Sequence, residues 1–417
     1  MSNNEIKRSA PIIPKFGPLS GVRVLSCGNI IAAPYAATLM AEMGAEVIHI
    51  ERPGVGDTAR GVPGEYGVNS FWAGQARNRL SFTLELNMKK EKSKEIFLGL
   101  IKQCDIWLES LVWLEKLGIN DEMVMEANPQ IVIVHVSGYG KKEFGGIPEV
   151  CERPSFDIIG QAFSGYLSIT GEEGGEFCPG KPMLDDYLTA YYAAFGALAA
   201  YINRLKTGKG EIVDLAQYEA ASYLIQRDFV EYYVSKKLPA RTGNTSQSQP
   251  YGVYETGDGR YVAVGTVGPA TYYRAIEVMG LDPEYFSFME CGVHYTAVTS
   301  PKGRELTAKI KEWMMQHTAQ EVEDLYNKAK VPAAVVNTIA DCFNHPHFLA
   351  RNNFVSYIDD DSGKEVKALD VIPKMKYTPG KVWRGGPKVG QDTDNILKNI
   401  LGYSEDKIAE FRADKII

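Results

Sequence analysis

The sequence predicts an α/β protein with a doubly wound, Rossmann-like sheet in a large domain, followed by a smaller α+β domain. In the N-terminal half, short apolar runs alternate with amphipathic helical segments, a pattern typical of βαβ units and a parallel sheet. From about residue 241, turn residues and two short strand-like runs replace that alternation. The length of 417 residues exceeds one ordinary core, so more than one domain is expected.

The first βαβ unit lies close to the N-terminus. The apolar run 22–27 predicts a buried strand, and a helix is expected to open at Pro34, because proline suits a first helical position. Gly44 then serves as a C-terminal cap after Met43. A second strand is predicted over 46–50, which completes the unit.

The alternation continues through the rest of the large domain. The predicted elements follow in the order strand 80–86, helix 89–104, strand 105–110, helix from about 121, and strand 131–138. A further helix over 187–205 carries apolar residues at three- and four-residue steps, so one face should pack against the sheet.

The domain limits follow from these elements. We expect a large α/β domain over 1–224, a small α+β domain over 225–340, and a loop-rich return over 341–417. The small domain contains a hairpin signal at 257–259. Its predicted helices span 303–315 and 319–329, and a last helix of the chain is expected over 393–401.

Composition and charge exclude several classes of protein. The net charge of -7 provides no broad cationic surface, so no nucleic acid partner is expected. No apolar stretch is long enough for a membrane span, and the N-terminal segment lacks the apolar core of a secretory signal, so we expect a cytoplasmic protein without a membrane partner. The six cysteines have no paired short spacing, which argues against a zinc site or a disulfide framework.

The loop after the first strand invites comparison with dinucleotide-binding proteins. Backbone N–H groups at a helix start can hold a pyrophosphate, and Glu51 occupies the place of a ribose-binding acid. The glycine fingerprint of such sites is absent from the loop 28–33, however. A dinucleotide role is therefore disfavoured.

The turn after the second strand offers a cation. Arg52 stands at the base of the glycine-rich segment 51–57, where its guanidinium could pair with a phosphate. It could equally form an ion pair on the surface of a solvated turn. The segment by itself does not decide between these interpretations.

Asp185 and Asp186 directly precede the helix expected at Tyr187. One of them could simply cap that helix. A carboxylate at this place would also be kept ionised by the helix dipole, with a lowered pKa, and could attack a thioester carbonyl. Backbone N–H groups at the helix start are then candidate oxyanion donors.

The histidines do not predict a metal site. His49 and His135 fall within strand runs, where they are expected to pack, and His345 and His347 flank a proline in a turn-like stretch. No cysteine cluster lies beside them, and neither a serine nucleophile elbow nor a phosphate-binding P-loop is present.

Motifs along nearly the whole chain resemble those of the family III CoA-transferases. The matching stretches are GVRVLSCGNIIAAPYAATLMAEMGAEVIHIERPGVGD (21–57), RNRLSFTLEL (77–86), HVSGYG (135–140), RPSFDIIGQAFSG (153–165), TGKGEIVDLAQYEA (207–220), RTGN (241–244), PYGVYETGDGRYVAVG (250–265) and RGGPKVGQDTDNIL (384–397). Their order and spacing carry the resemblance. The stretches PKFGPLSG, FDIIGQAFSGYLS and IPKMKYTPGKVWRGGP are most similar to the carnitine (γ-butyrobetaine, crotonobetaine) and bile-acid CoA-transferases.

The resemblance implies transfer of CoA from an acyl-CoA to a free carboxylate, through mixed anhydrides and an aspartyl-CoA thioester. CoA is then a substrate, and no metal or tightly bound cofactor is expected. The family's catalytic aspartate precedes an aromatic residue, which selects Asp186 over Asp185 as the nucleophile. Asp157 matches an acidic position that assists catalysis in formyl-CoA transferase.

The resemblance also implies a CoA-binding set. It comprises Arg52, the nucleotide-lining residues Leu84, Glu85, Leu86 and Asn87, and Ser110 and Lys116. The chain departs from the family around 110–113, where an Asn-x-x-Pro-Gly loop is replaced and shortened, so Ser110 and Lys116 are the least direct matches. Ile31 replaces a glutamine that lies near the thioester in formyl-CoA transferase.

The family architecture implied is a ring-shaped subunit interlocked with a second copy in a homodimer, with residues 341–417 completing the large domain.

The acceptor is expected to be of the carnitine type, and a bile acid or another carboxylic acid is the alternative. Four tyrosines near the small domain could hold a quaternary ammonium group through cation–π contacts, although core or interface packing explains most such rings: Tyr232, Tyr233, Tyr251 and Tyr254. Two other functions stay open, a 2-methylacyl-CoA racemase and a non-catalytic CoA-binding protein.

Overall fold

The computed structural model describes residues 8–417 except 63, 65, 112 and 247, and it divides into two compact units. Unit 1 comprises Met1–Ser164, Gly180–Gln226 and Ala350–Ile417, and unit 2 comprises Gly165–Pro179 and Arg227–Leu349. Gly165–Pro179, which falls inside the large domain predicted from the sequence, groups with unit 2. The C-terminal segment returns to unit 1.

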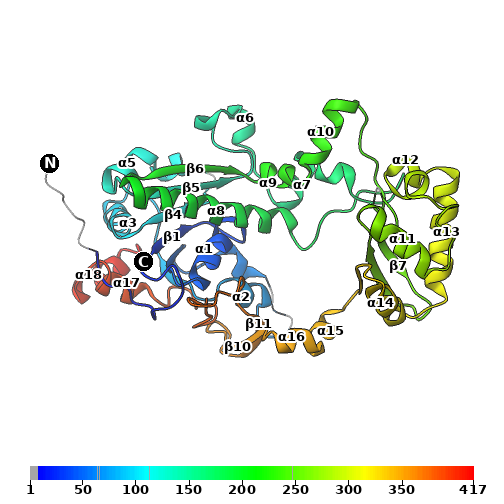
Figure 1. The fold of residues 1–417 in the computed structure, drawn as a ribbon. Coiled ribbons are helices and arrows are strands. Elements are labelled where there is room, and N and C mark those ends of the chain that lie inside the picture. The colour runs from blue at the N-terminus through cyan, green and yellow to red at the C-terminus, as the bar shows by residue number, and fades with distance from the viewer. Residues whose placement is uncertain (1–7, 63, 65, 112, 247) are drawn as a thin grey trace. The chain divides into compact units, whose positions relative to one another are not determined.

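Unit 1 is built on a parallel, six-stranded sheet with the order β3-β2-β1-β4-β5-β6 (Figure 1). The strands are β1 (Arg23–Cys27), β2 (Glu46–Glu51), β3 (Leu80–Thr83), β4 (Ile106–Glu109), β5 (Val132–Ser137) and β6 (Glu211–Ala216). This order reverses direction between β1 and β4, and ligands of such sheets bind beyond the carboxyl ends of the strands at that point.

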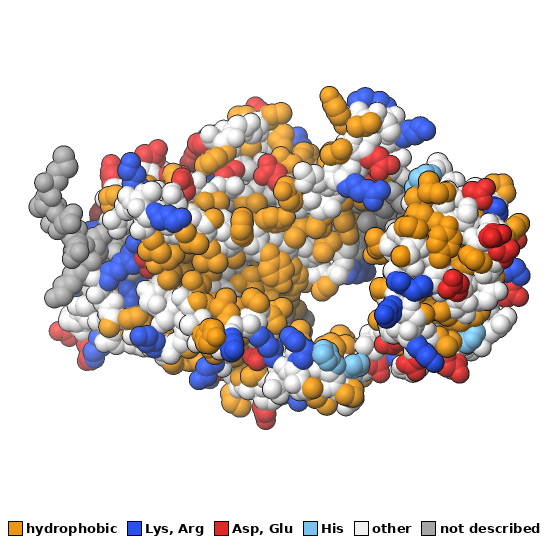
Figure 2. Space-filling view, viewed as in Figure 1, with side chains coloured by type: hydrophobic (Ala, Val, Ile, Leu, Met, Phe, Trp, Pro, Cys, Tyr) orange, Lys and Arg blue, Asp and Glu red, His pale blue; other side chains and the backbone are white. Residues whose placement is uncertain are grey.

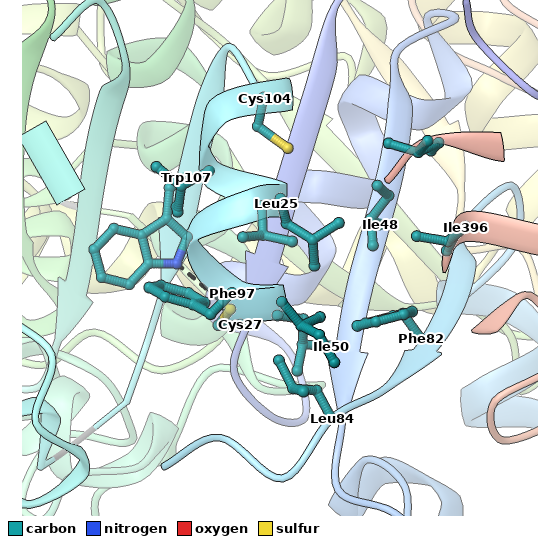
Figure 3. Close-up of a cluster of buried hydrophobic side chains, with 14 of the residues drawn as sticks. Leu25, Cys27, Ile48, Ile50, Phe82, Leu84, Phe97, Cys104, Trp107 and Ile396 are labelled. Carbon is teal, nitrogen blue, oxygen red and sulfur yellow. Dashed lines mark hydrogen bonds between the residues drawn. The ribbon is translucent and has the colours of Figure 1, made fainter. Parts of the chain in front are cut away.

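Both faces of the sheet are covered, because neighbouring residues of a strand point to opposite sides. Leu25 and Ile48 belong to a core formed with α3 (Glu91–Gln103), part of which is drawn in Figure 3. Val24 and Val47 belong to a second core formed with α1 (Ala32–Glu42) and α8 (Leu184–Thr207). The doubly wound α/β architecture predicted from the sequence is therefore confirmed.

Smaller elements complete unit 1. The helices are α2 (Ser70–Gln75), α4 (Leu114–Leu117), α5 (Asp121–Ala127), α6 (Pro148–Cys151), α7 (Asp157–Phe163), α9 (Gln217–Leu224), α17 (Thr393–Asn399) and α18 (Glu405–Ala413), and short turns of helix lie at Thr58–Gly61 and Lys142–Phe144. An antiparallel pair joins β10 (Phe354–Ile358) to β11 (Glu365–Leu369). Ile396 and Phe411 bring α17 and α18 into the core beside α3, so the C-terminal segment packs on the sheet.

Unit 2 holds a three-stranded antiparallel sheet in the order β7-β8-β9, formed by Tyr251–Glu255, Tyr261–Gly265 and Ala333–Val335. The predicted hairpin joins β7 to β8. Its helices are α11 (Gly268–Val278), α12 (Tyr295–Val298), α13 (Pro301–Met315), α14 (Ala319–Lys328) and α15 (Ile339–Asn344), with a π-helical turn at Phe288–Gly292 and a short helical turn at Tyr166–Ile169. Two helices run to or across its limits, α10 (Gln226–Ser235) and α16 (Pro346–Ala350). Tyr254 is buried in the unit's own core.

Two sequence predictions need correction in unit 1, and one strand of the sheet was not predicted. Strand β3 ends at Thr83 rather than at Leu86, so the following residues form a loop. Helix α8 begins at Leu184, and Asp185 and Asp186 consequently lie in its first turn instead of before it. Strand β6 was not predicted from the sequence.

Candidate functional site

Three aspartates meet where α8 begins. Because α8 is the last helix of the connection between the parallel strands β5 and β6, it leads back to the start of β6, and its own start lies toward the carboxyl edge of the sheet. Asp185 and Asp186 occupy its first turn, and Asp157 is the first residue of α7. The three side chains come from two helix starts in unit 1.

Asp157 caps α8. The N-cap of α8 is Met183, whose side chain accepts no hydrogen bond, and its backbone is left-handed with φ of 57°. Oδ1 of Asp157 accepts the backbone N–H groups of Asp185 at 2.7 Å and of Asp186 at 3.2 Å. These are the groups that an N-cap side chain normally satisfies. The alternative that Asp185 or Asp186 caps its own helix is therefore wrong.

Gln161 holds the capping carboxylate in place. Its Nε2 donates to Oδ2 of Asp157 at 2.7 Å and to the Gly180 carbonyl at 3.0 Å. Its Oε1 accepts the Gly180 N–H at 2.8 Å. All three hydrogen bonds of this buried amide therefore join it to Asp157 or to Gly180, which shortly precedes α8. Helix α7 and the segment leading into α8 are thereby tied together.

Asp186 is half-buried and is oriented by an amide. Nε2 of Gln217, the first residue of α9, donates a hydrogen bond to its Oδ1. The Gln217 Oε1 accepts the hydroxyl of Ser155 at 2.9 Å. No cationic side chain of the described residues pairs with Asp186, which leaves its charge uncompensated.

Asp185 is fully buried. Neither of its carboxylate oxygens has a hydrogen-bond partner among the described residues. Gly160 makes this possible, because a Cβ there would lie 1.9 Å from Oδ2 of Asp185. Burial, followed by the charges of Asp157 and Asp186, raises the pKa of Asp185 to about 8.

The pKa of Asp186 moves in the direction opposite to the sequence prediction. Burial, followed by the charge of Asp157, raises the pKa of Asp186 to about 7, and the Gln217 hydrogen bond lowers it only in part. The helix-start N–H groups do not offset this, since Asp157 takes them. The expectation of a lowered pKa was wrong because the dipole acts on a site that burial and a neighbouring acid dominate.

The predicted oxyanion donors are also occupied. The N–H groups of Asp185 and Asp186 bond to Asp157, and that of Tyr187 bonds to the Met183 carbonyl at 3.2 Å. The Tyr187 hydroxyl accepts from Gln75 at 2.6 Å, and its ring meets Tyr35 of α1 edge to face. The first turn of α8 is therefore fixed from both sides.

The residues predicted to bind CoA follow three strands, β2, β3 and β4, at the carboxyl edge of the same sheet. Arg52 follows β2, Leu84 follows β3 and Ser110 follows β4. Backbone bonds join these segments, from Leu84 N–H to the Glu51 carbonyl at 3.0 Å and from Ser110 N–H to the Cys27 carbonyl at 2.9 Å. The set thus surrounds the reversal point of the sheet, between β1 and β4.

In the segment predicted to line the nucleotide, residues 84–87, several side chains are packed or partly packed against the protein. Leu84 packs into the core with 1% exposure, and Leu86 packs partly against the same core. The Glu85 N–H donates to the Ile416 carbonyl at 2.7 Å, and Oδ1 of Asn87 accepts the Lys89 N–H at 3.0 Å. Glu85 and Asn87 are half-buried.

The two predicted cations are exposed. Arg52 has no acidic partner among the described residues, so the surface ion pair considered for it is not formed. Lys116 lies with Nζ 4.4 Å from the ring centroid of Trp113. Gly28 approaches Ser110 so closely that a Cβ would lie 2.3 Å from its Oγ.

Glu51, the candidate ribose-binding acid, is occupied. Both of its oxygens accept from Arg60, at 2.7 and 2.8 Å, and its side chain is fully buried. Ser81 and the Asp57 N–H also donate to it. This structural role agrees with the absence of the glycine fingerprint.

Sequence reasoning missed Gln217, Gln161 and Ser155. Each is a neutral side chain whose role arises from contacts between segments distant in sequence. The run EIVDLA before Gln217 carried the one available signal, because a polar residue directly after a strand of a parallel sheet lies at its functional edge.

The described part of the chain contains neither a membrane-spanning helix nor a metal-binding cluster. No helix there is both long and apolar enough to cross a bilayer. Within the same residues, no three His, Cys, Asp or Glu side chains are grouped so that they could hold a metal ion.

Comparison with known proteins gives consistent results. A family model described as CoA-transferase family III matches residues 19–393. The chain is 39% identical over 407 residues to the bile acid CoA-transferase BaiK of Clostridium scindens, covering 95% of this chain and 89% of that protein. It is 32% identical to the succinyl-CoA–L-malate CoA-transferase β subunit of Chloroflexus aurantiacus, over 96% of this chain and 98% of that protein.

Solved structures share the fold. A CaiB/BaiF family protein from Brucella suis matches with a TM-score of 0.75 and 25% identity, covering 92% of this chain and 99% of that one. The protein Rv3272 of Mycobacterium tuberculosis matches with a TM-score of 0.76 and 22% identity, covering 92% and 100%.

Proposed function

The chain belongs to CoA-transferase family III, and we propose that Asp186 is the nucleophile with which it moves CoA from an acyl-CoA to a free carboxylate. The observation that carries the proposal is the state of this carboxylate, which is oriented by the Gln217 amide and not neutralised by a cation. With its pKa near 7, an appreciable fraction is ionised at neutral pH and remains nucleophilic.

The reaction begins with attack of an Asp186 oxygen on the acyl carbonyl of the donor. The C–S bond breaks, CoA leaves as the thiolate, and a mixed anhydride forms on Asp186. The thiolate then attacks Cγ of Asp186, which releases the donor carboxylate and stores CoA as an aspartyl thioester. An acceptor carboxylate attacks Cγ, and the same steps run in reverse. Thioester and anhydride are similar in reactivity, so the protein contributes mainly position and hydrogen-bond donors.

Asp157 acts through position. Its carboxylate fixes the N–H groups of Asp185 and Asp186, so it sets the direction in which the nucleophile leaves the helix. Its charge also raises the pKa of Asp186, after the larger effect of burial. We assign it this positioning role in place of direct contact with substrate.

The CoA moiety is proposed to bind along the carboxyl edge of β3, β2, β1 and β4. Arg52 and Lys116 are exposed cations there and can meet phosphate oxygens. The loop with Leu84, Glu85, Leu86 and Asn87 lines the nucleotide, and Ser110 closes the edge beside Gly28. Neighbouring Arg60 is not available, because Glu51 and Asp361 hold it.

For the acceptor, we propose a bile-acid-type carboxylate in preference to the carnitine type expected from the sequence. The bile acid CoA-transferase is 39% identical to this chain. The tyrosines considered for a quaternary ammonium group give little support, because Tyr254 is buried and Lys236 already lies 5.8 and 4.7 Å from the ring centroids of Tyr232 and Tyr233. A cationic substrate would be repelled there.

A racemase mechanism has less support. It requires a histidine–aspartate pair, and in the part of the chain that the structure describes neither Asp157 nor Asp186 has a histidine among its hydrogen-bond partners. The paired histidines are buried elsewhere, His49 with Asp57 and His135 with Glu109.

We also propose that a second copy covers the outer face of α8. Four large apolar side chains of that helix are 50 to 72% exposed, namely Tyr191, Phe195, Ile202 and Leu205, and Figure 2 shows hydrophobic side chains gathered over this part of unit 1. Such a patch is typical of an interface. The interlocked, ring-shaped dimer of the family would provide the cover. Dilution that yields folded monomers would contradict it.

The decisive experiment compares Asp186→Asn with Asp185→Asn. The two residues are adjacent and chemically identical, so the second variant is a matched control. Asp186→Asn should lower CoA transfer by roughly a thousandfold or more, while Asp185→Asn keeps at least about a tenth of kcat. Transfer is assayed with an acyl-CoA and a panel of steroid, betaine and dicarboxylic acids, with α-proton exchange measured in the same samples.

Hydroxylamine trapping supplies the second measurement. The wild-type protein with acyl-CoA should give an adduct at Asp186, and mass spectrometry should exclude deamidation of Asp186→Asn. More than trace transfer in that variant, together with no trapped adduct in the wild type, would remove Asp186 as the nucleophile.

A further inference from the structure

Gln217 is held in a defined position beside Asp186, the proposed nucleophile. It follows β6 directly, begins α9 and is 5% exposed. A carboxylate has no hydrogen to donate, so the amide must present Nε2 to Asp186 and Oε1 to the Ser155 hydroxyl, as found. The orientation of the amide is thus determined by partners on both sides.

We propose that Gln217 is a catalytic residue whose Nε2–H group holds Oδ1 of Asp186 as the carbonyl and oxyanion oxygen throughout the reaction, which leaves Oδ2 as the attacking atom. This inference rests on the proposed role of Asp186. It extends that role by naming the group that stabilises the tetrahedral intermediates at Cγ.

Oδ1 of Asp186 has the same function in both halves of the reaction: it carries the negative charge of the tetrahedral intermediate at Cγ. When thiolate attacks Cγ of the anhydride, the C=O pair moves onto Oδ1, where Gln217 meets the developing charge. The pair then returns, the Cγ–Oδ2 bond breaks, and Oδ2 leaves within the donor carboxylate. When the acceptor attacks the thioester, the charge again forms on Oδ1, and thiolate is expelled on its return. Oδ1 is therefore the oxygen that needs a fixed donor.

Backbone groups do not supply that donor. The N–H groups of Asp185, Asp186 and Tyr187 are committed to Asp157 and Met183. In the part of the chain that the structure describes, no group other than Gln217 donates to the Asp186 carboxylate. A preorganised donor at a developing oxyanion is worth about 10²–10³ in kcat.

The test uses Gln217→Leu and Gln217→Glu beside Asp186→Asn. Gln217→Leu removes the donor, and we expect kcat to fall about 10²- to 10³-fold with the KM for acyl-CoA within about threefold of wild type. Gln217→Glu has nearly the same shape and can keep the Ser155 bond, but an ionised carboxylate cannot donate, so an equal or larger fall in kcat is expected.

A role limited to packing predicts that Gln217→Glu keeps a kcat near that of the wild type at a pH where Asp186 is fully ionised, because the variant fills the same space and the added carboxylate, like Asp157, only raises the pKa of Asp186. It therefore decides the question even if Gln217→Leu fails to fold. The acid limb of kcat/KM should also move to higher pH in Gln217→Leu. In the wild type, the Gln217 hydrogen bond lowers the pKa of Asp186, while burial and the neighbouring acids Asp157 and Asp185 favour its protonated form. Loss of that bond should therefore raise the pKa further.

The outcomes separate the two proposals. A folded Gln217→Glu with kcat within about threefold of wild type, while Asp186→Asn is inactive, overturns the role of Gln217 alone. Full activity in Asp186→Asn overturns both. Loss of kcat in Gln217→Leu and Gln217→Glu, with acyl-CoA binding retained, supports the donor role.

Discussion

Two groups of buried acids lie at the carboxyl edge of the same sheet, and they differ in what faces them. Glu51, the last residue of β2, is paired with Arg60, and Asp57 in the following turn is paired with His49. Asp185 and Asp186, at the start of α8, meet no cation among the described residues, and the carboxylate of Asp157 lies beside them. We call the first group the paired acids and the second the unpaired acids.

Their pKa values move in opposite directions, although burial acts to raise the pKa in both groups. Burial raises the pKa of Glu51, but the bonds from Arg60, the charge of His49 and the bond from Ser81 outweigh it, and the net pKa is lowered. Burial and the neighbouring carboxylates raise the pKa of the unpaired acids, and the Gln217 hydrogen bond lowers the pKa of Asp186 only in part. No cation of the described residues offsets the rise. Depth alone therefore does not mark the reactive group. The reactive carboxylate is instead distinguished by the absence of a compensating cation. A pKa perturbed in this way is the pattern expected of a functional site.

Removal of the cation from the paired acids has the largest expected effect. In Arg60→Met, Glu51 stays fully buried and loses both guanidinium bonds, at 2.7 and 2.8 Å. A broken buried pair costs about 3–5 kcal/mol because one charge is left uncompensated. The urea midpoint of the unit 1 transition should fall accordingly at pH 7.

Arg52→Met is the matched control. The two arginines belong to the same loop, but Arg52 is exposed and has no acidic partner among the described residues. Its replacement should change stability by no more than about 0.5 kcal/mol. Equal losses in both variants would mean that pairing does not distinguish the two groups of acids.

The fold was largely predictable from the sequence. Apolar runs such as 22–27 and 131–138 correspond to buried strands of the sheet, where the hydrophobic pattern is strongest. Strand β6 was missed because its residues are mostly half-buried and alternate less clearly with polar ones. The end of β3 was misplaced, since Leu84 is as buried as a strand residue although it lies in a loop.

The electrostatics of the site were not predictable. Sequence reasoning considered only the dipole of the helix that carries Asp186, because that interaction is local. Asp157, distant in the chain, takes the N–H groups of that helix and adds a like charge. A pKa direction set by burial and by a distant acid requires the tertiary structure.

Gly160→Ala sharpens the comparison at the unpaired acids. The added methyl group would lie 1.9 Å from Oδ2 of Asp185 and 3.0 Å from Cγ of Gln217. Overpacking of this kind costs about 1–3 kcal/mol, more than alanine gains in a helix. We expect a lower thermal midpoint and reduced kcat, measured by calorimetry and by CoA transfer.

Gly74→Ala serves as its control. Gly74 also lies within a helix, α2, and a Cβ there meets nothing within 4 Å. Alanine should be neutral or stabilise by up to about 1 kcal/mol. A loss in Gly74→Ala as large as that in Gly160→Ala would remove contact with Asp185 as the cause.

The smallest effect expected is in the pH dependence of the wild-type protein. With the pKa of Asp186 at about 7, about a tenth of the nucleophile is ionised at pH 6. The value of kcat/KM, which reports the free enzyme, should therefore be about tenfold lower at pH 6 than on its alkaline plateau. An acid limb near pH 4 would show that the carboxylate has an ordinary pKa and is not an unpaired acid.

Stability should follow pH in the opposite sense for the two groups of acids. Between about pH 4 and 7 the folded chain keeps a proton on Asp186 that the unfolded chain releases, so this residue makes stability fall as pH rises, while activity increases. Glu51, with its lowered pKa, contributes stability that is lost as pH falls through its folded pKa. Thermal midpoints across this range should therefore decline less with rising pH in Asp186→Asn than in the wild type. Parallel curves for the two proteins would mean that Asp186 carries no extra proton in the folded state, and the distinction between paired and unpaired acids would then rest on geometry alone.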